Sequence, residues 1–359
     1  MCRFLILFFV SALVFSCNSY KGQLVGVSGN VQSEEFEDLG MVYIPSGSFE
    51  MGVADDKFNL ADAPKKRVSL SPFYIDKTEI TFKEYREFVY SVRDSLGLTE
   101  GYDKSKLIYT NPDTKEEINI YPNTTVWEDN FPESRISISE YFDEGNTVLD
   151  QYPVVGVNWK QALAFTVWRT KKMNTGVVFS LPTEAQWEYA AKGGIKNLKY
   201  PWIGSGTKND AGFYLANFYP MPGNYVSDNG EIYIVPVAQF AKNGFGLYDM
   251  AGNVSEWVLD NYSPISYQSS NDHNPLYSDH SSGFKVVRGG SWKDISYFLQ
   301  VGARDWQRKD STYSYVGFRC VANYMGTAVN SNTPNPEKDI PLNLRLKNMK
   351  QKLRKGKDK

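Results

Sequence analysis

Beyond its middle the chain reads Gly244-Phe245-Gly246-Leu247-Tyr248-Asp249-Met250-Ala251-Gly252-Asn253-Val254-Ser255-Glu256-Trp257. Glycines, an asparagine and two carboxylic acids alternate here with bulky apolar residues, too densely for an ordinary strand or helix. We therefore expect a tight, structured loop around which the rest of the domain is built.

The two carboxylates of this loop have two interpretations. A hard cation such as calcium takes about six to eight oxygen ligands, from carboxylates and from main-chain carbonyls that a Gly-rich turn can aim inward. Asp249 and Glu256 would supply the carboxylates, and the bends at Gly252 and Asn253 would turn carbonyls toward the same point. Alternatively, Asn253 and Glu256 cap turns and accept hydrogen bonds from backbone N–H groups. The residues alone leave both interpretations open.

The composition is typical of a globular protein in which positive and negative charges nearly balance. The 359 residues are 42% hydrophobic and 15% aromatic, with a formal net charge of −2. Such a chain can bury a full core in one large domain or in two small ones. Because neither charge sign dominates, the composition does not indicate a nucleic-acid partner.

The first residues predict export and lipid attachment. Arg3 precedes an almost wholly apolar run from Phe4 to Phe15, which is too short to span a bilayer comfortably. We expect residues 1–16 to be a signal peptide, and Ser16 directly before Cys17 resembles the lipobox of bacterial lipoproteins. Cys17 would then carry the lipid; the alternative is an ordinary signal peptide followed by a chance cysteine. Residues 17–38 are polar with little periodicity, which predicts a flexible tether.

The cysteine count agrees with the lipid interpretation. The chain has three cysteines. Cys2 leaves with the signal peptide, Cys17 is modified, and Cys320 remains, so the mature chain has no second thiol for an intramolecular disulfide. The exported body must then be stabilised by its core, by aromatic packing or by metal.

Regular elements are predicted from residue 39 onward. Met41 to Gly52 predicts a short hairpin around a Pro-Ser-Gly turn, and Val68 to Ile75 predicts a further strand. Thr81 is placed to cap a helix whose apolar residues recur at three- and four-residue steps. Residues 98–151 are polar and rich in turns, so we expect an elaborated surface insertion there.

After the insertion, the pattern predicts two more helices. Tyr152 to Val157 is typical of a buried strand, and Asn158 caps a helix that runs through Lys171. Thr183 and Gln186 form a capping box at the start of the next helix. Helix signals then become scarce, and short strands are expected at Ile232 to Val237 and at Lys285 to Arg288.

The C-terminal residues 327–359 form a basic tail. From Leu342 onward, Lys and Arg are frequent and apolar residues recur at three- and four-residue steps. This pattern favours an amphipathic helix suited to a partner groove or an anionic surface. A solvated terminus is the alternative.

Together these segments resemble the formylglycine-generating enzyme, or sulfatase-modifying factor, family. The resemblance implies an α+β fold: a formylglycine-generating-enzyme-like, C-type-lectin-related single mixed domain over residues 39–326, with little regular secondary structure. The matching segments are Met41 to Gly52, Phe73 to Thr81, Tyr152 to Trp159, Leu181 to Tyr189, Tyr200 to Trp202, Phe245 to Trp257, Val287 to Trp292 and Gly317 to Cys320.

The resemblance also implies structural calcium. Carried over position by position, Asp249 and Glu256 would contribute side-chain oxygens, while Gly252 and Val254 would contribute carbonyls. A weaker second calcium site would involve Asn217 and Phe218 with an acidic residue about a dozen positions later. Asp228 or Asn229 would fill that place, although the intervening loop differs in length.

The catalytic groups of the enzyme relatives are missing. Their cysteine pair would follow Gly289-Gly290-Ser291, where this chain has Trp292 to Leu299 without a thiol. His273 and His280, with Asp272 or Asp279, are poorly spaced for a two-His, one-carboxylate iron site. Cys320 is expected to be a buried packing thiol. Glu184 and Glu188 are interpreted as a solvated or backbone-bonding helix face.

A narrower resemblance concerns the GldK/PorK lipoproteins of the type IX secretion and gliding machinery. It rests on Glu79 to Thr81, Glu84 to Val89, Val92 to Ser95, Tyr152 to Trp159, Trp168 to Thr170, Ala216 to Phe218, Val287 to Leu299 and Ser314 to Arg319, and it includes the insertion around Tyr121 to Trp127. It implies a non-enzymatic lipoprotein, anchored through Cys17 to the periplasmic face of the outer membrane. Such a protein would self-associate into a ring with a periplasmic partner of the PorN/GldN type. The chain is shorter than usual members, mostly at its C-terminus.

Two other functions stay open at this point. One is a sulfatase-modifying-type oxidoreductase with an unrecognised metal site. The other is a ligand-binding module in which aromatic loops around Trp202, Tyr214 and Trp306 grip a sugar or peptide.

Overall fold

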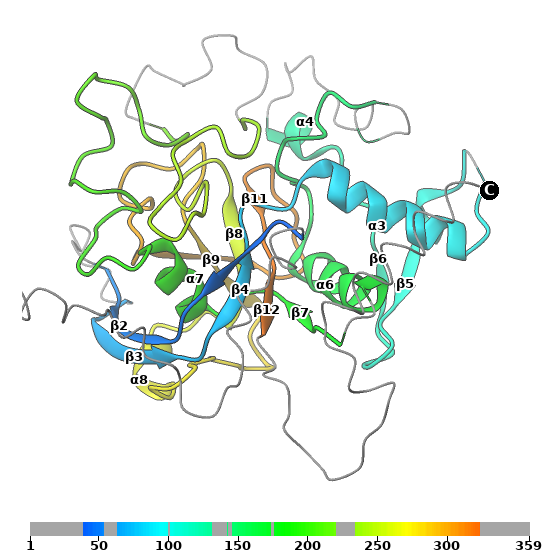
Figure 1. Ribbon diagram of the computed structural model, residues 1–359. Coiled ribbons are helices and arrows are strands. Elements are labelled where there is room, and N and C mark those ends of the chain that lie inside the picture. Colours follow the sequence, from blue (N-terminus) through cyan, green and yellow to red (C-terminus); the bar gives the residue numbers. More distant parts are fainter. Residues whose placement is uncertain are drawn as a thin grey trace, which may run out of the picture. The chain divides into compact units, whose positions relative to one another are not determined.

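Two four-stranded sheets organise the computed structural model, which describes residues 39–53, 63–99, 101–130, 142, 146–173, 176–219 and 234–323. The first sheet has the strand order β1 (Met41–Ile44), β4 (Phe73–Asp76), β12 (Val321–Asn323) and β7 (Phe179–Ser180). All of its pairings are antiparallel. Strands near both ends of the described chain therefore meet in one sheet (Figure 1).

The second sheet is built from the later half of the chain. Its order is β10 (Arg304–Arg308), β9 (Phe284–Arg288), β8 (Ser255–Asn261) and β11 (Val316–Gly317). The short β11 runs parallel to β8, whereas the other pairs are antiparallel. Three residues, 318–320, join β11 to β12 and so carry the chain from one sheet to the other.

Two small strand pairs make up the other sheets among the described residues. β2 (Gly47–Met51) pairs with β3 (Lys66–Leu70), and β5 (Ile108–Thr110) pairs with β6 (Glu117–Asn119). The predicted hairpin over Met41 to Gly52 is wrong, because β1 and β2 find different partners. The single strand predicted from Val68 to Ile75 is also divided: Pro72, which has no backbone N–H, lies between β3 and β4.

The helices begin where the capping residues predict. In α3 (Phe82–Ser95), Thr81 and Glu84 form a reciprocal capping box. Thr183 and Gln186 do the same for α7 (Glu184–Ala191). Asn158 caps α6 (Trp159–Met173), because its Oδ1 accepts from the N–H of Gln161 at 2.9 Å. In turn, Oε1 of Gln161 accepts from the N–H of Asn158 at 2.8 Å. Within the described ranges there are also three shorter helices, η1 (Lys104–Lys106), α4 (Val126–Asn130) and α8 (Ser266–Ser269).

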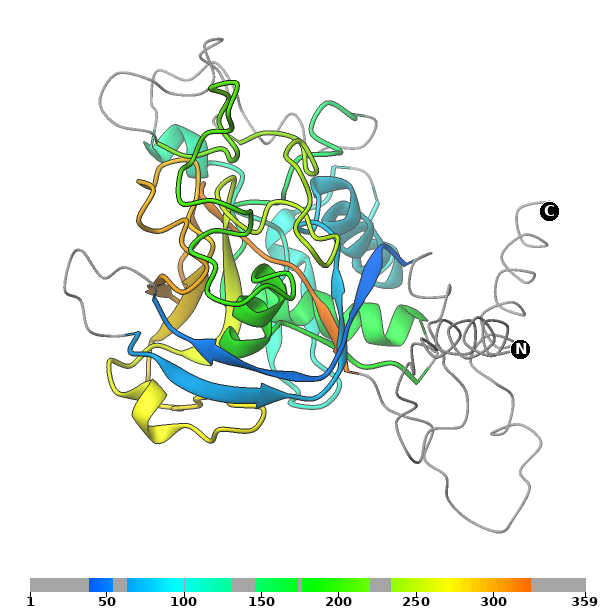
Figure 2. The ribbon, with the colours of Figure 1, turned by 60° about the vertical axis from the view of Figure 1, so that its left-hand side comes forward.

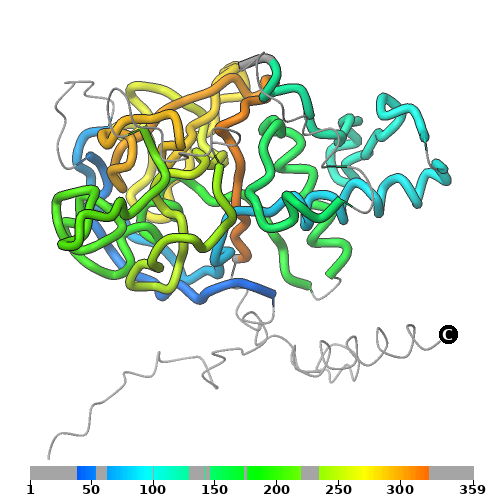
Figure 3. The backbone as a smooth tube through the Cα atoms, turned by 90° about the horizontal axis from the view of Figure 1, so that it is seen from above, coloured from blue at the N-terminus to red at the C-terminus, as the bar shows by residue number. Residues whose placement is uncertain are grey.

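The main hydrophobic core lies between α3, α6 and the first sheet. Tyr85 and Phe88 of α3 pack against Phe165 of α6, and Phe318, from the segment joining the sheets, packs against Tyr85 and Phe165. A second core lies around α7, β2 and β3. Figures 2 and 3 show α3 and α6 on one side of β12 and the loop-rich later half on the other.

The insertion predicted over residues 98–151 is not a surface feature alone. Ile118, Trp127, Phe142 and Leu149 are buried in the main core. Trp127 stacks on Trp292, with ring centroids 5.5 Å apart. Scattered apolar residues in a polar segment can thus bury themselves individually, without the periodicity that marks a core-facing helix or strand.

Of the two short strands predicted in the later part of the chain, the structure shows one. β9 confirms the strand predicted at Lys285 to Arg288. The strand predicted at Ile232 to Val237 is absent from its described part, residues 234–237. The signal peptide with Cys17, the tether over 17–38 and the tail over 327–359 lie outside the described residues. No helix in the described ranges has both the length and the apolar character needed to cross a membrane.

Candidate metal-binding centre

The loop that precedes β8 is tightly turned, as predicted. Asp249, Gly252 and Asn253 have φ values of 55°, 78° and 59°, in the left-handed region that favours glycine and asparagine. A Cβ at Gly252 would collide with the carbonyl oxygen of Asn217. This position therefore requires glycine, because the two loops approach each other through their backbones.

Asn253 ties this loop to three distant segments. Its N–H donates to the carbonyl of Asn217 at 2.8 Å, and its Oδ1 accepts from the N–H of Val235 at 2.9 Å. Its Nδ2 donates to Oε1 of Glu79 at 3.1 Å. Asn253 is 1% exposed, so these bonds satisfy polar groups that are buried within the fold.

Glu256 forms the centre of a buried ion pair. Arg319 donates through Nε to Oε2 and through Nη2 to Oε1, both at 2.7 Å, and the indole N–H of Trp187 donates to Oε2 at 2.8 Å. Arg319 also donates to the carbonyl oxygens of Asp76 and Tyr248. The backbone-capping role considered for Glu256 is therefore replaced by a bidentate side-chain pair.

Asp249 and Glu79 leave two buried oxygens without a donor. Oδ2 of Asp249 accepts from the N–H of Ala238 at 2.6 Å, but Oδ1 has no hydrogen-bond partner, and neither has Oε2 of Glu79. Burial raises the pKa of both carboxyl groups. The negative charges of Asp249 and Glu256 raise the pKa of Glu79 further, and the charge of Glu256 raises that of Asp249, whereas a hydrogen bond between the Asp249 and Glu79 side chains lowers the pKa of Asp249. The positive charge of Arg319 lowers the pKa of both.

The charges around this centre do not balance. Glu79, Asp249 and Glu256 face one guanidinium, that of Arg319, and a buried charge without compensation is costly. Either protons or a cation must compensate the excess negative charge. The residues fit calcium, because Asp249 and Glu79 offer free carboxylate oxygens. Calcium would neutralise the two acids and fix the loop.

Glu256 already uses both carboxylate oxygens to accept hydrogen bonds from Arg319 and Trp187, which limits its part in binding such a cation. Within the described ranges, no three His, Cys, Asp or Glu side chains form a group that could hold a metal ion. A cation beside Asp249 would take further oxygens from carbonyls or water, and the contribution of Gly252, Val254 and Glu256 stays a prediction. No ligand role was predicted for Glu79. In the sequence this acid lies between the buried strand β4 and the buried Ile80, a position that does not by itself indicate a metal ligand.

The second predicted calcium site is described only in part. Asn217 and Phe218 are buried, at 4% and 3% exposure, and the carbonyl of Asn217 accepts the N–H of Asn253. Asp228 and Asn229 lie outside the described residues. This site stays a prediction.

A second buried charge cluster lies on α7, which corrects the expectation that Glu184 and Glu188 form a solvated helix face. Neither is solvated: they are 2% and 0% exposed. The backbone-bonding alternative holds for Glu188, which accepts from the N–H of Gly52 at 2.9 Å. Glu188 pairs with Arg288 at 2.6 Å, and Glu184 pairs with Arg304 at 2.9 Å. Both arginines come from the second sheet, so no pattern within the helix could reveal that its acids face inward to meet them.

The segment that follows Gly289-Gly290-Ser291 is used for packing. Trp292 is 6% exposed, and its backbone N–H donates to the carbonyl of Asn253 at 2.9 Å. The carboxylate of Asp294 accepts from the N–H and hydroxyl of Ser291 at 2.9 and 2.6 Å. Cys320 is fully buried, which raises the pKa of its thiol well above the usual value. The expectation of a packing thiol is confirmed.

The two histidines have different surroundings. Nδ1 of His273 lies 3.2 Å from the hydroxyl of Ser69. His280 lines a cavity of about 360 Å³ beside Lys285. Burial lowers the pKa of Lys285 to about 8, and its Nζ donates to the carbonyl of Leu259 at 2.7 Å.

The three aromatic residues considered for ligand binding are also separated. Trp202 stacks on Tyr200, and Tyr214 packs against Phe218, both beside one small apolar cluster. Trp306 lies on β10 against Phe284. The contacts therefore show packing roles in two places.

Comparison with known proteins identifies the relatives of this arrangement. The family model "Sulfatase-modifying factor enzyme 1-like domain" matches residues 28–324. The formylglycine-generating enzyme of Mus musculus is 31% identical over 300 residues, covering 80% of this chain and 76% of that protein. The inactive C-alpha-formylglycine-generating enzyme 2 of Mus musculus is 29% identical over 298 residues, covering 80% and 86%. The structure of PvdO from Pseudomonas aeruginosa matches with a TM-score of 0.55 at 24% identity, over 79% of this chain and 93% of that one, and supports the fold alone.

Proposed function

The chain belongs to the family of sulfatase-modifying factor enzyme 1-like domains, with their α+β fold of sparse regular structure, and we propose that it is a non-catalytic, structural member. One observation carries this proposal: the segment after Ser291 has Trp292 and Asp294 committed to packing and backbone hydrogen bonds, with no thiol. The chain's one cysteine after Cys17 is the buried Cys320.

A non-catalytic role is consistent with the use of the buried charges. Glu256 pairs with Arg319, and Glu184 and Glu188 pair with Arg304 and Arg288, so the strongest interactions hold segments of the fold together. One of the similar proteins is itself named as inactive. Calcium bound at Asp249 and Glu79 would add a further structural constraint.

In its finer form, the proposal is a lipoprotein of the type IX secretion and gliding machinery. The support is the lipobox-like Ser16-Cys17 and the resemblance of the chain to the GldK/PorK lipoproteins. The protein would be anchored through Cys17 to the periplasmic face of the outer membrane. There it would self-associate into a ring together with a periplasmic partner of the PorN/GldN type.

Fractionation of native membranes tests the anchor and the assembly. The wild-type protein is expected in the outer-membrane fraction, in a particle much larger than one chain of 40.8 kDa. A Cys17→Ala variant should leave the membrane, whereas Cys2→Ala, a matched change within the signal peptide, should not. Retention of the Cys17→Ala variant in the membrane would contradict the lipid anchor, and a monomeric wild type would contradict the ring.

Elemental analysis tests the proposal against the oxidoreductase alternative. The purified protein is expected to contain calcium and no stoichiometric copper or iron. Copper or iron at one equivalent would overturn the non-catalytic assignment, because the family's oxidative chemistry would then have a redox metal to support it.

A further inference from the structure

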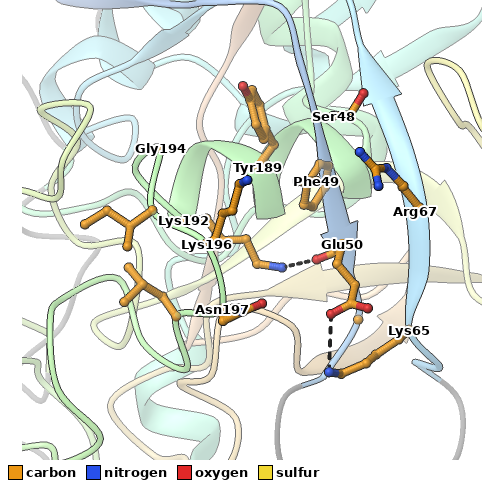
Figure 4. Close-up of a pocket in the computed structure, with 13 residues that line it drawn as sticks. Ser48, Phe49, Glu50, Lys65, Arg67, Tyr189, Lys192, Gly194, Lys196 and Asn197 are labelled. Carbon is orange, nitrogen blue, oxygen red and sulfur yellow. Dashed lines mark hydrogen bonds and ion pairs between the residues drawn. The ribbon is translucent and has the colours of Figure 1, made fainter.

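A basic pocket lies between the β2–β3 pair and the end of α7. It has a volume of about 510 Å³, which is within the range of small-molecule sites. Figure 4 shows Glu50 and Phe49 of β2, Arg67 of β3, and Lys196 of the segment after α7 around it. None of the residues assigned to the metal-binding centre lines this pocket.

The pocket has cationic groups without acidic partners. Four cationic side chains line it, against the single carboxylate of Glu50, which pairs with Lys65 at 3.2 Å. Arg67 and Lys196 are exposed, and within the described ranges neither has an acidic partner. A guanidinium beside an ammonium is a favourable arrangement for an oxyanion, which accepts bonds from both.

The floor of the pocket is held rigidly by buried bonds. Lys192 donates to the carbonyl of Glu50, and it pairs with Glu188 at 2.6 Å. Glu188 also accepts from the N–H of Gly52 at 2.9 Å and pairs with Arg288. Because these bonds hold the ammonium group of Lys192 against Glu188 and Glu50, the cationic groups free to turn toward a ligand are those of Arg67 and Lys196.

The walls add apolar surface next to these charges. The rings of Phe49 and Tyr189 lie 5.1 Å apart, centroid to centroid. Ile195 is 40% exposed, and it lines the pocket with Leu198. The apolar part of a ligand would therefore pack against these side chains while its charged group contacts Arg67 and Lys196.

We propose that this pocket binds a small organic anion, a phosphate ester or carboxylate carried on an aromatic or aliphatic body. Arg67 and Lys196 bind the oxyanion, and Phe49, Tyr189 and Ile195 contact the body. The pocket shares no residue with the metal-binding centre or with the lipid attachment at Cys17. Ligand binding can therefore be measured on the purified protein whether or not the protein binds calcium or carries a lipid.

Titration calorimetry with four probes tests the proposal. Phenyl phosphate and benzoate are expected to bind saturably, and inorganic phosphate and phenol at least tenfold more weakly, because each lacks one half of the recognised chemistry. A preference between phenyl phosphate and benzoate then distinguishes the two oxyanions. Absence of saturable binding by either aromatic anion would overturn the proposal.

Single charge reversals identify the site. Arg67→Glu and Lys196→Glu should each weaken phenyl phosphate binding at least tenfold, whereas Lys106→Glu, at an exposed residue of η1 outside the pocket, should not. Both pocket residues are exposed, so the variants should melt at the wild-type temperature, which checks that they are folded. Equal affinity in all three variants would place the binding elsewhere and contradict the proposal.

Discussion

Arg319 binds both carboxylate oxygens of Glu256 at 2.7 Å, and through this pair the segment joining β11 to β12 is bound to β8. Arg319 and Glu256 are 0% exposed. Because Arg319 is buried, its remaining N–H groups donate to main-chain carbonyls, which include those of Asp76 and Tyr248. One arginine thus connects both sheets and the loop around Asp249.

Loss of this arginine should destabilise the protein strongly. Arg319→Leu leaves Glu256 buried without its cation, for which we expect a loss of about 3–5 kcal/mol in the free energy of unfolding. The control is Lys172→Leu, which removes a 2.8 Å pair with Glu87 between half-exposed side chains. That change should cost less than about 1 kcal/mol. Chemical denaturation measures both, and equal losses would contradict a special role for Arg319.

Calcium should raise the melting temperature of the wild-type protein. At a concentration of about 100 times its dissociation constant, calcium would add about 2.7 kcal/mol to the free energy of unfolding. Glu79→Gln and Asp249→Asn should reduce this response, because each removes a carboxylate with a free buried oxygen. Glu256→Ala should lower the melting temperature both in calcium and in chelator, because it leaves Arg319 buried without its partner. Equal melting of the wild type in calcium and in chelator would refute the calcium assignment.

The calcium response should grow as the pH rises. In the metal-free protein, burial raises the pKa of Glu79 and Asp249, so their protonated forms favour folding. This contribution is present below their ordinary pKa values and is lost as the pH rises through the raised ones. Calcium replaces the lost protons as compensation. Thermal melting in calcium and in chelator should therefore diverge with increasing pH, and a constant difference would contradict this coupling.

Asp260 should give a separate fall in stability toward neutral pH. Burial, and then the negative charge of Glu184, raises the pKa of Asp260 from 3.8 to about 7. The contribution of the neutral acid is present below pH 3.8 and is lost as the pH rises through about 7. Asp260→Asn is uncharged throughout, so the difference in unfolding free energy between variant and wild type should change across this window. A constant difference from pH 4 to pH 8 would show that Asp260 does not titrate there.

The insertion should contribute to stability through Trp127. This side chain is 3% exposed and stacks on Trp292. Trp127→Ala should cost about 3–5 kcal/mol, since it removes a large buried ring and leaves a cavity. Phe213 is 70% exposed, and Phe213→Ala should change the free energy of unfolding by no more than about 0.5 kcal/mol. Similar small effects of both changes would show that the insertion is not part of the core.

Much of the candidate site was visible in the sequence, but its ligand set was not. The density of glycine, asparagine and acids between Phe245 and Trp257 predicted a tight loop, and the positive φ values of Asp249 and Asn253 agree with it. Glu79 was missed because its carboxylate meets that of Asp249 only across the fold. The partners of Glu184 and Glu188 were missed for the same reason, since the helix pattern contains no trace of Arg288 or Arg304.

The sequence by itself determined the features that depend on neighbouring residues. The capping boxes at Thr81 and Thr183, the turns around Gly252 and the strand at Lys285 to Arg288 all arise from bonds and conformations within a few positions. Tertiary structure alone decided which strands pair and which charges meet. β1 pairs with β4 instead of its neighbour β2, and Glu256 meets an arginine 63 residues away. A buried charge pairs with an opposite charge that the fold places beside it. Which residues lie side by side depends on how the whole core packs, and a local sequence pattern does not contain that information.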